Sequence, residues 1–452
     1  MASFGGAPVE LARFGDSTAS VNGGYDLFKT NPTDTTELYS TMVTAEPVSL
    51  SPNSTEVSCS IPASAEHFTD LAHSYIEVTV KFTGKDGGNL AAATSADMKV
   101  WPDSNLAHSM FSRMALKIND TEVFYTSAYN YLSYLDTLVH ETKSAKKGRL
   151  TAGGWYEDSL AGRDVTAAAD HAAAVAERKK LIAGSREVSF TMRPLTPFRD
   201  SPKRLPPGVS LKLTATRADI TSIIMSAEAD PDVKMELLRF KWHVRRCVAN
   251  PSVVRAFQSR FLEGAKCSMS FPRSRCRNFV VPNGVQSHRV VLAEKDFLPL
   301  LLLVAIADQD AVNGSFAKSP YNFQPNGVST YELLLDGVAL GPALKCDFAN
   351  KNAIEAYTQT LSALGQLYSR TGNGVSYQDF MDNKTVVAFA MNEPKNKEWS
   401  NYFHIKRKGT LELIITFSAP TTKALTVLVS DLREDNLQID MEGRIYTTQP
   451  AV

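Results

Sequence analysis

Two halves of the chain carry the same succession of short motifs, about 200 residues apart. Each half has a hairpin dipeptide, a stretch with helical spacing, a V-x-F-x-M run and a glycine before an apolar strand pattern. The matched positions, in chain order, are Asn119-Asp120 and Asp336-Gly337, then Val188 and Val387, then Gly208 and Gly409. Their offsets of 387 − 188 = 199 and 409 − 208 = 201 residues nearly coincide. A succession kept at one spacing predicts two related domains.

Strand patterns dominate both halves. In residues 75–82 (YIEVTVKF) apolar and polar side chains alternate, which is the period of a half-buried strand. Comparable strand patterns occupy residues 114–124, 188–192, 209–215, 331–335, 386–391 and 411–417. The apolar run at residues 297–307 predicts a buried strand or a short helix. Helical spacing occurs at residues 128–138, 167–182 and 352–364.

Short strands separated by long insertions predict an all-β fold of the sandwich type. A unit of about 200 residues fits an eight-stranded jelly roll if about half of its residues lie in loops, so we expect two eight-stranded β-sandwiches with short helices and long loop insertions. The polar stretch at residues 225–234 favours a domain break there. The expected division is therefore an N-terminal arm at 1–24, a first jelly roll at 25–234, a second at 235–445 and a C-terminal tail at 446–452.

Charge and cysteine content exclude several classes of protein. The 452 residues carry 48 Lys and Arg against 48 Asp and Glu, which argues against a strongly basic nucleic-acid coat and against an acidic tail. Five cysteines without a C-x-x-C pair are typical of a reducing compartment. The start of the chain lacks a signal-peptide pattern, so we expect a protein that is not secreted.

Motifs for catalysis and for metal binding are incomplete. Gly372-Asn373-Gly374 lacks the third glycine of a dinucleotide fingerprint, and Ser144 replaces the second histidine of an H-E-x-x-H zinc motif that would begin at His140. No Walker A or G-x-S-x-G sequence occurs. We expect a protein that is not an enzyme and has no catalytic residues, cofactor or metal.

One segment departs from the neutral charge balance. Residues 239–277 hold ten Lys and Arg and one acid, Glu263, a local net charge of +10 − 1 = +9. Two interpretations stay open: a solvated face paired with acids elsewhere, or a patch that faces nucleic acid, an acidic partner or an anionic membrane. The candidate inward basic patch consists of Arg245, Arg246, Arg255, Arg260, Arg273 and Arg275.

Several stretches together resemble polinton (Maverick)-type, adintovirus-like major capsid proteins. They are residues 25–33, 70–78 (DLAHSYIEV), 106–112 (LAHSMFS), 313–323 (NGSFAKSPYNF), 335–337 and 372–376. The resemblance runs from about residue 25 to residue 445. It implies the double jelly-roll capsid lineage that includes adenovirus hexon, and so an all-β double jelly roll in which two eight-stranded β-sandwiches lie side by side.

The resemblance also implies a function and partners. Three copies would form a pseudo-hexagonal trimer, and trimers would tile an icosahedral shell in a virion made in the host cytoplasm or nucleus. Expected partners are the chain itself, penton and minor or cement capsid proteins, and an internal membrane or genome touched by the basic segment; no small-molecule substrate is expected. Loops at 85–106, 160–184 and 311–327 are candidates for contacts between subunits, the last through Phe316, Tyr321 and Phe323. That last loop has an equally open alternative, packing on its own domain.

Two functions from other classes compete with the capsid role. A carbohydrate-active hydrolase on a β-sandwich needs two carboxylates that converge in a cleft, and the sequence singles out no such pair. A cellular binding module is the other alternative.

Overall fold

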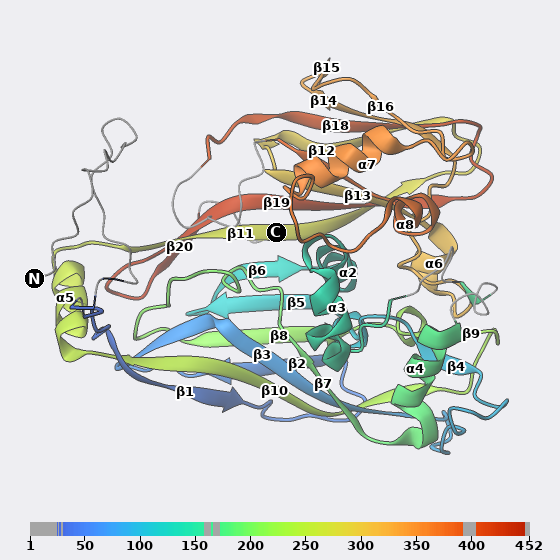
Figure 1. Ribbon diagram of the computed structural model, residues 1–452. Coiled ribbons are helices and arrows are strands. Elements are labelled where there is room, and N and C mark those ends of the chain that lie inside the picture. Colours follow the sequence, from blue (N-terminus) through green and yellow to red (C-terminus); the bar gives the residue numbers. More distant parts are fainter. Residues whose placement is uncertain are drawn as a thin grey trace, which may run out of the picture.

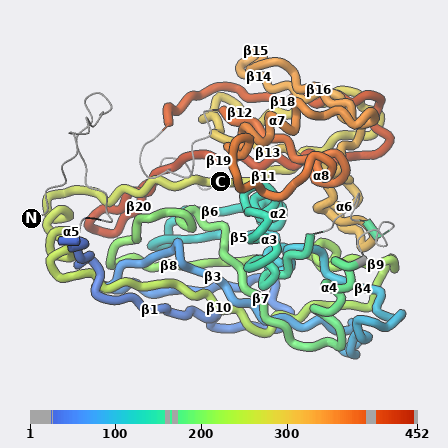
Figure 2. The backbone as a smooth tube through the Cα atoms, viewed as in Figure 1, coloured from blue at the N-terminus to red at the C-terminus, as the bar shows by residue number. Residues whose placement is uncertain are grey.

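The computed structural model describes residues 25, 27–28, 30–157, 164–165, 172–391 and 404–447, which form two β-sandwiches (Figures 1 and 2). The first sandwich packs a sheet of order β1-β10-β3-β7 on a sheet of order β2-β8-β5-β6. We call them the β1 sheet and the β2 sheet. Their strands are β1 (Glu37–Ala45), β2 (Glu56–Ile61), β3 (His67–Thr83), β5 (Phe111–Ile118), β6 (Thr121–Thr126), β7 (Val188–Met192), β8 (Leu211–Arg217) and β10 (Lys234–Ala249).

The second sandwich packs the β11 sheet, of order β11-β19-β13-β17, on the β12 sheet, of order β12-β18-β14-β15. In addition, β20 pairs with β19, and β16 pairs with β14. The strands are β11 (Cys267–Val281), β12 (Ser287–Phe297), β13 (Leu301–Asp308), β14 (Val328–Leu335), β15 (Val338–Ala339), β16 (Leu344–Lys345), β17 (Val386–Ala390), β18 (Lys408–Phe417), β19 (Leu425–Ile439) and β20 (Ile445–Thr447).

The two sandwiches have one topology. If the eight principal strands of each are numbered along the chain, leaving out β4 and β9 in the first half and β16 and β20 in the second, both give sheets of order 1-8-3-6 and 2-7-4-5. Eight antiparallel strands connected in this way form a jelly roll. The expected all-β double jelly roll is therefore confirmed.

The repeat found in the sequence marks equivalent strands. The two V-x-F-x-M runs lie in β7 and β17, which are the sixth strand of each sandwich, and the two glycines precede or begin the seventh strands, β8 and β18. The hairpin dipeptides also serve as expected, because Asn119 and Asp120 have φ of 46° and 63°, and Asp336 and Gly337 have φ of 51° and 81°. Positive φ at both central residues suits the twist of a tight hairpin.

Strand pairing moves the expected boundary between the domains. Division at 234/235 separates Lys234 from the rest of β10, yet β10 pairs with β1 and β3 along its length and is the last strand of the first sandwich. Within the polar stretch, residues 227–233 connect β9 to β10. We propose that the division lies instead at α5 (Pro251–Leu262), which follows β10 and precedes β11. The expected tail at 446–452 likewise begins inside β20, while residues 1–24 and 448–452 lie outside the described part of the chain.

Helices and short strands fill the insertions. The three expected helices are α2 (Tyr129–His140), α4 (Ala172–Ile182) and α7 (Ile354–Ala363). The others are α1 (Leu106–Ser109), α3 (Lys143–Lys147), α5, α6 (Gln309–Gly314) and α8 (Tyr377–Asp382), with 3₁₀ turns at Arg149–Gly153, Ala183–Ser185 and Ile220–Ser222. The strands β4 (Val100–Pro102) and β9 (Ile224–Ser226) form a small extra pair. Local signals set several starts, such as the Asn250 cap and Pro251 at the start of α5 and the capping box of α8.

The molecule has two different ends. In Figure 1 the insertion elements α4, α6, β4 and β9 lie at the right-hand end, while α5 crosses the left-hand end beside β20. No helix among the described residues is long and apolar enough to cross a membrane.

Apolar cores lie between successive layers. The first core fills the space between the β1 and β2 sheets, and the second fills the space between the β11 and β12 sheets. A third cluster joins the sandwiches, because α2 packs its Tyr131, Tyr134 and Leu135 against the outer face of the β11 sheet. The four sheets therefore stack in the order β1, β2, β11, β12 (Figure 1).

Candidate assembly surfaces

The aromatic loop proposed to reach a neighbouring subunit is packed inside the chain. Tyr321 and Phe323 have exposed fractions of 1% and 0%. Their rings lie against Tyr134 of α2, with centroids 4.7 and 5.8 Å away. Phe316 is partly buried against the first core. The expectation that these three side chains contact another subunit is thus wrong for Tyr321 and Phe323, because the contact between the two sandwiches already buries them.

Polar contacts hold the same loop to the first sandwich. The backbone N–H of Ser226 in β9 donates to the carbonyl oxygen of Phe316 at 2.7 Å. The Ser319 hydroxyl donates to the buried Asp103 carboxylate, which also pairs with Arg178 of α4 at 3.3 Å. The loop is therefore an intrachain connection between the sandwiches.

Part of the basic segment is neutralised within the second sandwich. Arg275 Nε donates to both carboxylate oxygens of Asp431 at 2.9 Å, and Arg277 reaches the same carboxylate at 3.3 Å. Arg273 pairs with Asp435. Both aspartates lie on β19 and have an exposed fraction of 0%. Because β11 and β19 pair directly, alternate residues of the two strands face each other, and the arginines meet acids that are distant in sequence.

The remaining candidate arginines lie elsewhere. Arg245 of β10 pairs with Glu37 of β1 at 3.5 Å, and Arg246 donates to the carbonyl oxygen of Pro62. Burial lowers the pKa of Arg246. Arg255 and Arg260 lie on α5 with exposed side chains, the second beside Glu263 at 3.6 Å. The six arginines do not gather into one patch, and the paired-charge interpretation describes four of them (Arg245, Arg260, Arg273 and Arg275).

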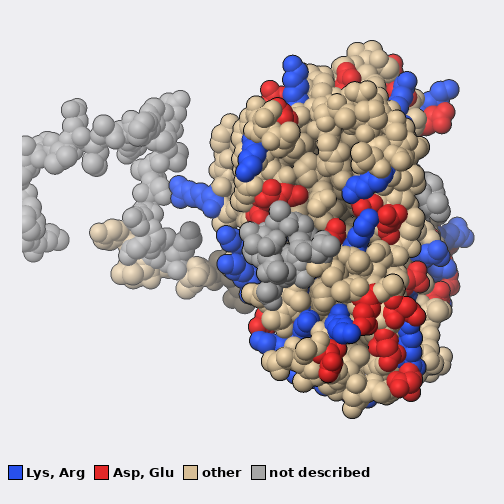
Figure 3. Space-filling model, turned by 90° about the vertical axis from the view of Figure 1, so that its right-hand side faces the viewer, with Lys and Arg blue, Asp and Glu red and all other residues tan. Residues whose placement is uncertain are grey.

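The insertion end of the molecule carries charges of both signs. Figure 3 views this end and shows Lys and Arg side chains close to Asp and Glu side chains. Two ion pairs join the segments before β4 and before β10: Lys85 with Asp230 at 2.5 Å and Lys99 with Glu228 at 2.7 Å. Mixed charge of this kind gives no uniform field for nucleic acid.

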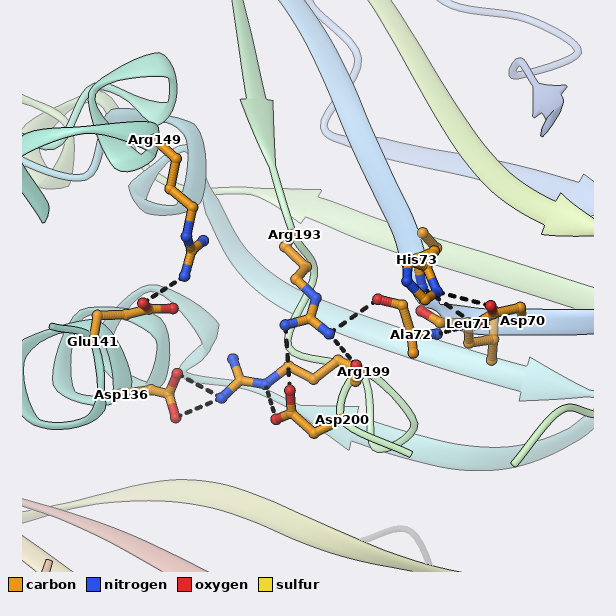
Figure 4. A network of polar contacts seen from close by, with 11 residues as sticks. Asp70, Leu71, Ala72, His73, Asp136, Glu141, Arg149, Arg193, Arg199 and Asp200 are labelled. Atoms are coloured by element: carbon orange, nitrogen blue, oxygen red, sulfur yellow. Dashed lines mark hydrogen bonds and ion pairs between the residues drawn. The ribbon is translucent and has the colours of Figure 1, made fainter. Parts of the chain in front are cut away.

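A polar network braces α2 against the rest of the first sandwich (Figure 4). Asp136 of α2 pairs with Arg199 at 2.8 Å and with His140 at 3.2 Å. Burial alone would raise the pKa of Asp136, but Arg199 and His140 outweigh it and hold this pKa well below its usual value. Nearby, Arg193 donates to the carbonyl oxygen of Ala72 in β3 at 3.0 Å. The network fixes the helix that forms the contact with the β11 sheet.

In the described part of the chain, two outer sheet faces carry exposed side chains, and sequence reasoning did not single them out. On the β1 sheet, Tyr75 stacks on His243 with centroids 4.4 Å apart, and His243 Nδ1 lies 2.9 Å from the Thr44 hydroxyl. Tyr75 and Met42 are 39% and 45% exposed. The alternation in residues 37–45, 67–83 and 234–249 contains these outward positions, so their pattern was available in the sequence.

The opposite outer face belongs to the β12 sheet. Arg289 of β12 pairs with Glu412 of β18, and Val291 lies directly across from Glu412 in the strand register. Val291, Val338 and Leu340 are exposed apolar side chains. Each end of the four-layer stack thus presents apolar and polar side chains together, a composition that protein–protein contacts share with other protein surfaces.

Comparisons with known proteins agree with this topology. The Sputnik virophage structure determined by cryo-EM matches with a TM-score of 0.63 and 13% identity, over 97% of this chain and 94% of that chain. The PBCV-1 virus capsid matches at 0.60 and 11%, over 93% and 99%, and the mavirus major capsid protein at 0.54 and 11%, over 98% and 97%. The chain has the double jelly-roll fold of viral capsid proteins.

Comparison of sequences finds less similarity to known proteins than comparison of structures. No family model matches the chain. The uncharacterized protein F54H12.2 of Caenorhabditis elegans is 21% identical over 367 residues, which are 78% of this chain and 84% of that protein. The double jelly-roll likeness therefore rests on the arrangement of strands.

Proposed function

We propose that this protein is a major capsid protein, whose copies form pseudo-hexagonal trimers that tile an icosahedral viral shell. The observation that carries the proposal is the presence of two sandwiches of identical topology, stacked side by side in one chain. Three such chains supply six similar sides, so one gene product can occupy a six-neighbour lattice position. The capsid proteins with the same fold support this role.

The order of the layers indicates how copies would meet. Inside the chain, α2 and β6 of the first sandwich meet the β11 sheet of the second. If copies repeat this relationship, the outer face of the β12 sheet meets the β1 sheet of the next copy. Such a head-to-tail contact forms a closed ring when the rotation between copies closes. Tyr75 and Met42 on one side, and Val291 and Val338 on the other, would lie in it.

The finer assignment concerns the virus lineage and its location. The segments at 106–112 and 313–323 support a polinton-like origin, and the fold supports a place in the virion. Penton and minor capsid proteins would be further partners. No observation on the described residues favours the hydrolase or the binding module, and no group of three or more His, Cys, Asp or Glu among them is placed to hold a metal ion.

Light scattering on the purified chain tests the proposal. We expect a mass of three times 49.5 kDa, and electron microscopy should show particles with pseudo-sixfold outlines. A chain that stays monomeric at every concentration that can be reached would contradict the capsid role.

A further inference from the structure

The helix that joins the two sandwiches leaves its apolar side incompletely covered. In α5 the residues Val253, Phe257 and Phe261 recur every four positions and so share one face. Phe257 contacts Phe68 edge-on, with centroids 5.5 Å apart, and Phe261 at 4.6 Å. None of the twelve residues of α5 is fully buried. A helix whose apolar face is half-buried leaves room for another apolar group.

A groove of about 350 Å³ begins at Val253, the residue of α5 in its lining. The start of β1, the end of β10 and the start of β11 form its other walls, with Phe68 and Met269 as apolar lining and Glu37, Lys203 and Arg204 as charged lining. The volume is at the lower end of cavities that hold ligands of about 300–1,000 Å³, and it suits a few apolar side chains. Cys267, a half-buried thiol, also lines the groove.

The start of the described chain runs past this groove. The Asn250 cap of α5 donates from its backbone N–H to the carbonyl oxygen of Thr36 at 2.9 Å, and from its side chain to that of Thr35 at 3.1 Å. Thr36 itself belongs to the groove wall. Farther upstream, Leu27 and Phe28 are 82% and 99% exposed. Among the described residues, none before Thr36 lines the groove.

The sequence before this point has side chains that fit an apolar groove. Residues 1–24 contain Phe4, Val9, Leu11 and Phe14. At roughly 3.3 Å for each residue, 24 residues can span on the order of 80 Å, which is enough to reach an adjacent copy.

We propose that the groove beside α5 binds the N-terminal segment, residues 1–24, of a second copy of the chain. This inference adds to the proposed function a specific contact between copies. It rests on that function, because the contact forms only if copies of the chain associate. The apolar side chains of the segment would pack on Val253 of α5 and on Phe68 and Met269 of the groove. Each copy then holds the segment of its neighbour.

Disulfide trapping in the full-length protein tests the contact. Single variants V9C, L11C and F14C place a thiol in the segment, and Cys267 supplies the partner, since the other four native thiols are buried. Under mild oxidation with copper phenanthroline, we expect a dimer-sized product on non-reducing gels for at least one variant. Adding Cys267→Ser should remove it.

A matched pair of substitutions on α5 checks that the groove itself is used. Val253→Asp lies in the groove wall, whereas Ala256→Asp lies on the exposed side of the same helix. We expect the first to reduce the cross-linked fraction at least tenfold and the second to leave it unchanged, with equal thermal unfolding of the two variants as the check on folding.

Two outcomes overturn the inference. A cross-link within one chain, which migrates as a monomer, shows that the segment occupies its own groove. If no cross-link forms but light scattering still gives a trimer, the groove does not bind the N-terminal segment. The proposed function then stands, because the copies still associate. A dimer-sized product in a protein that never forms trimers would support this contact while contradicting the trimer.

Discussion

The Lys146 ammonium group donates a hydrogen bond of 2.7 Å to the carbonyl oxygen of Asn373, and so joins the first sandwich to a loop of the second. It donates a second bond of 2.7 Å to the carbonyl oxygen of Leu138 and lies 5.8 Å from the centre of the Trp155 ring. Lys146 is almost fully buried. One side chain therefore satisfies acceptors from two elements that are more than 200 residues apart.

Replacing Lys146 by methionine should destabilise the protein. Methionine keeps most of the volume but leaves two buried carbonyl oxygens without a donor, at about 1–3 kcal/mol for each acceptor. We expect the free energy of unfolding to fall by roughly 2–6 kcal/mol in urea denaturation followed by circular dichroism. Lys147→Met, at the exposed neighbouring position, is the control and should change little.

Stability should also depend on pH through Lys146. Burial lowers the pKa of this lysine from 10.5 to about 8. Between these two values the unfolded chain binds a proton that the folded chain has released, so the contribution of Lys146 to stability rises with pH. We expect the free-energy difference between the parent protein and Lys146→Met to grow by about 1–2 kcal/mol from pH 7.5 to pH 9.5. A difference that shrinks over this range would contradict the assignment.

Replacing the buried Asp431 should strongly destabilise the protein. Its carboxylate accepts hydrogen bonds from Arg275 and Arg277 and lies 3.4 Å from Arg433. Asp431→Asn keeps the shape but leaves three guanidinium groups without this charge, and breaking a buried pair costs about 3–5 kcal/mol. Chemical denaturation should show this loss. Glu442→Gln, which removes the fully exposed ion pair with Arg444, should leave the midpoint unchanged.

Phe323 distinguishes an internal contact from one between subunits. Because it is fully buried between the sandwiches, Phe323→Ala should reduce the stability of the isolated chain by about 3–5 kcal/mol. If Phe323 lay in the contact between subunits, its replacement would instead weaken only the association of copies. Thermal unfolding at a concentration where the chain is monomeric separates the two, and an unchanged melting temperature there would favour the subunit contact. The partly buried Phe316 should have a smaller effect when replaced by Ala.

The exposed face of the β1 sheet should be required for trimers. Combining Met42→Glu with Tyr75→Glu places two charges on a face that is open in the single chain, where burial against a neighbour would need their desolvation. We expect the trimer mass to fall to that of the monomer in light scattering at concentrations at least tenfold above the parent midpoint. Val48→Glu, an exposed position in the loop after β1, should keep the trimer; if it dissociates equally, the β1 face is not the contact.

Local patterns in the sequence were sufficient for the fold. Alternation predicted β3 and β5, the positive-φ dipeptides predicted the hairpins, and the 199-residue offset predicted a second copy of the same topology. These signals are local because strand faces, turns and caps depend on neighbouring residues. The expected domain boundary at 234/235 differs from the one that we propose at α5, because a polar loop before a strand and a polar linker between domains have similar composition.

The sequence by itself determined two related β-sandwich domains, through periodicity and an internal repeat, and its resemblance to capsid proteins implied that each is a jelly roll. Only the tertiary structure decided which side chains contact each other across the molecule. Arg273 and Arg275 form part of a run of positive charge in the sequence, yet strand pairing sets them against Asp435 and Asp431. Tyr321 and Phe323 look like contact residues in a loop, yet α2 buries them. Pairing and burial join residues that are far apart in the chain, and no local pattern of charge or hydrophobicity specifies those partners.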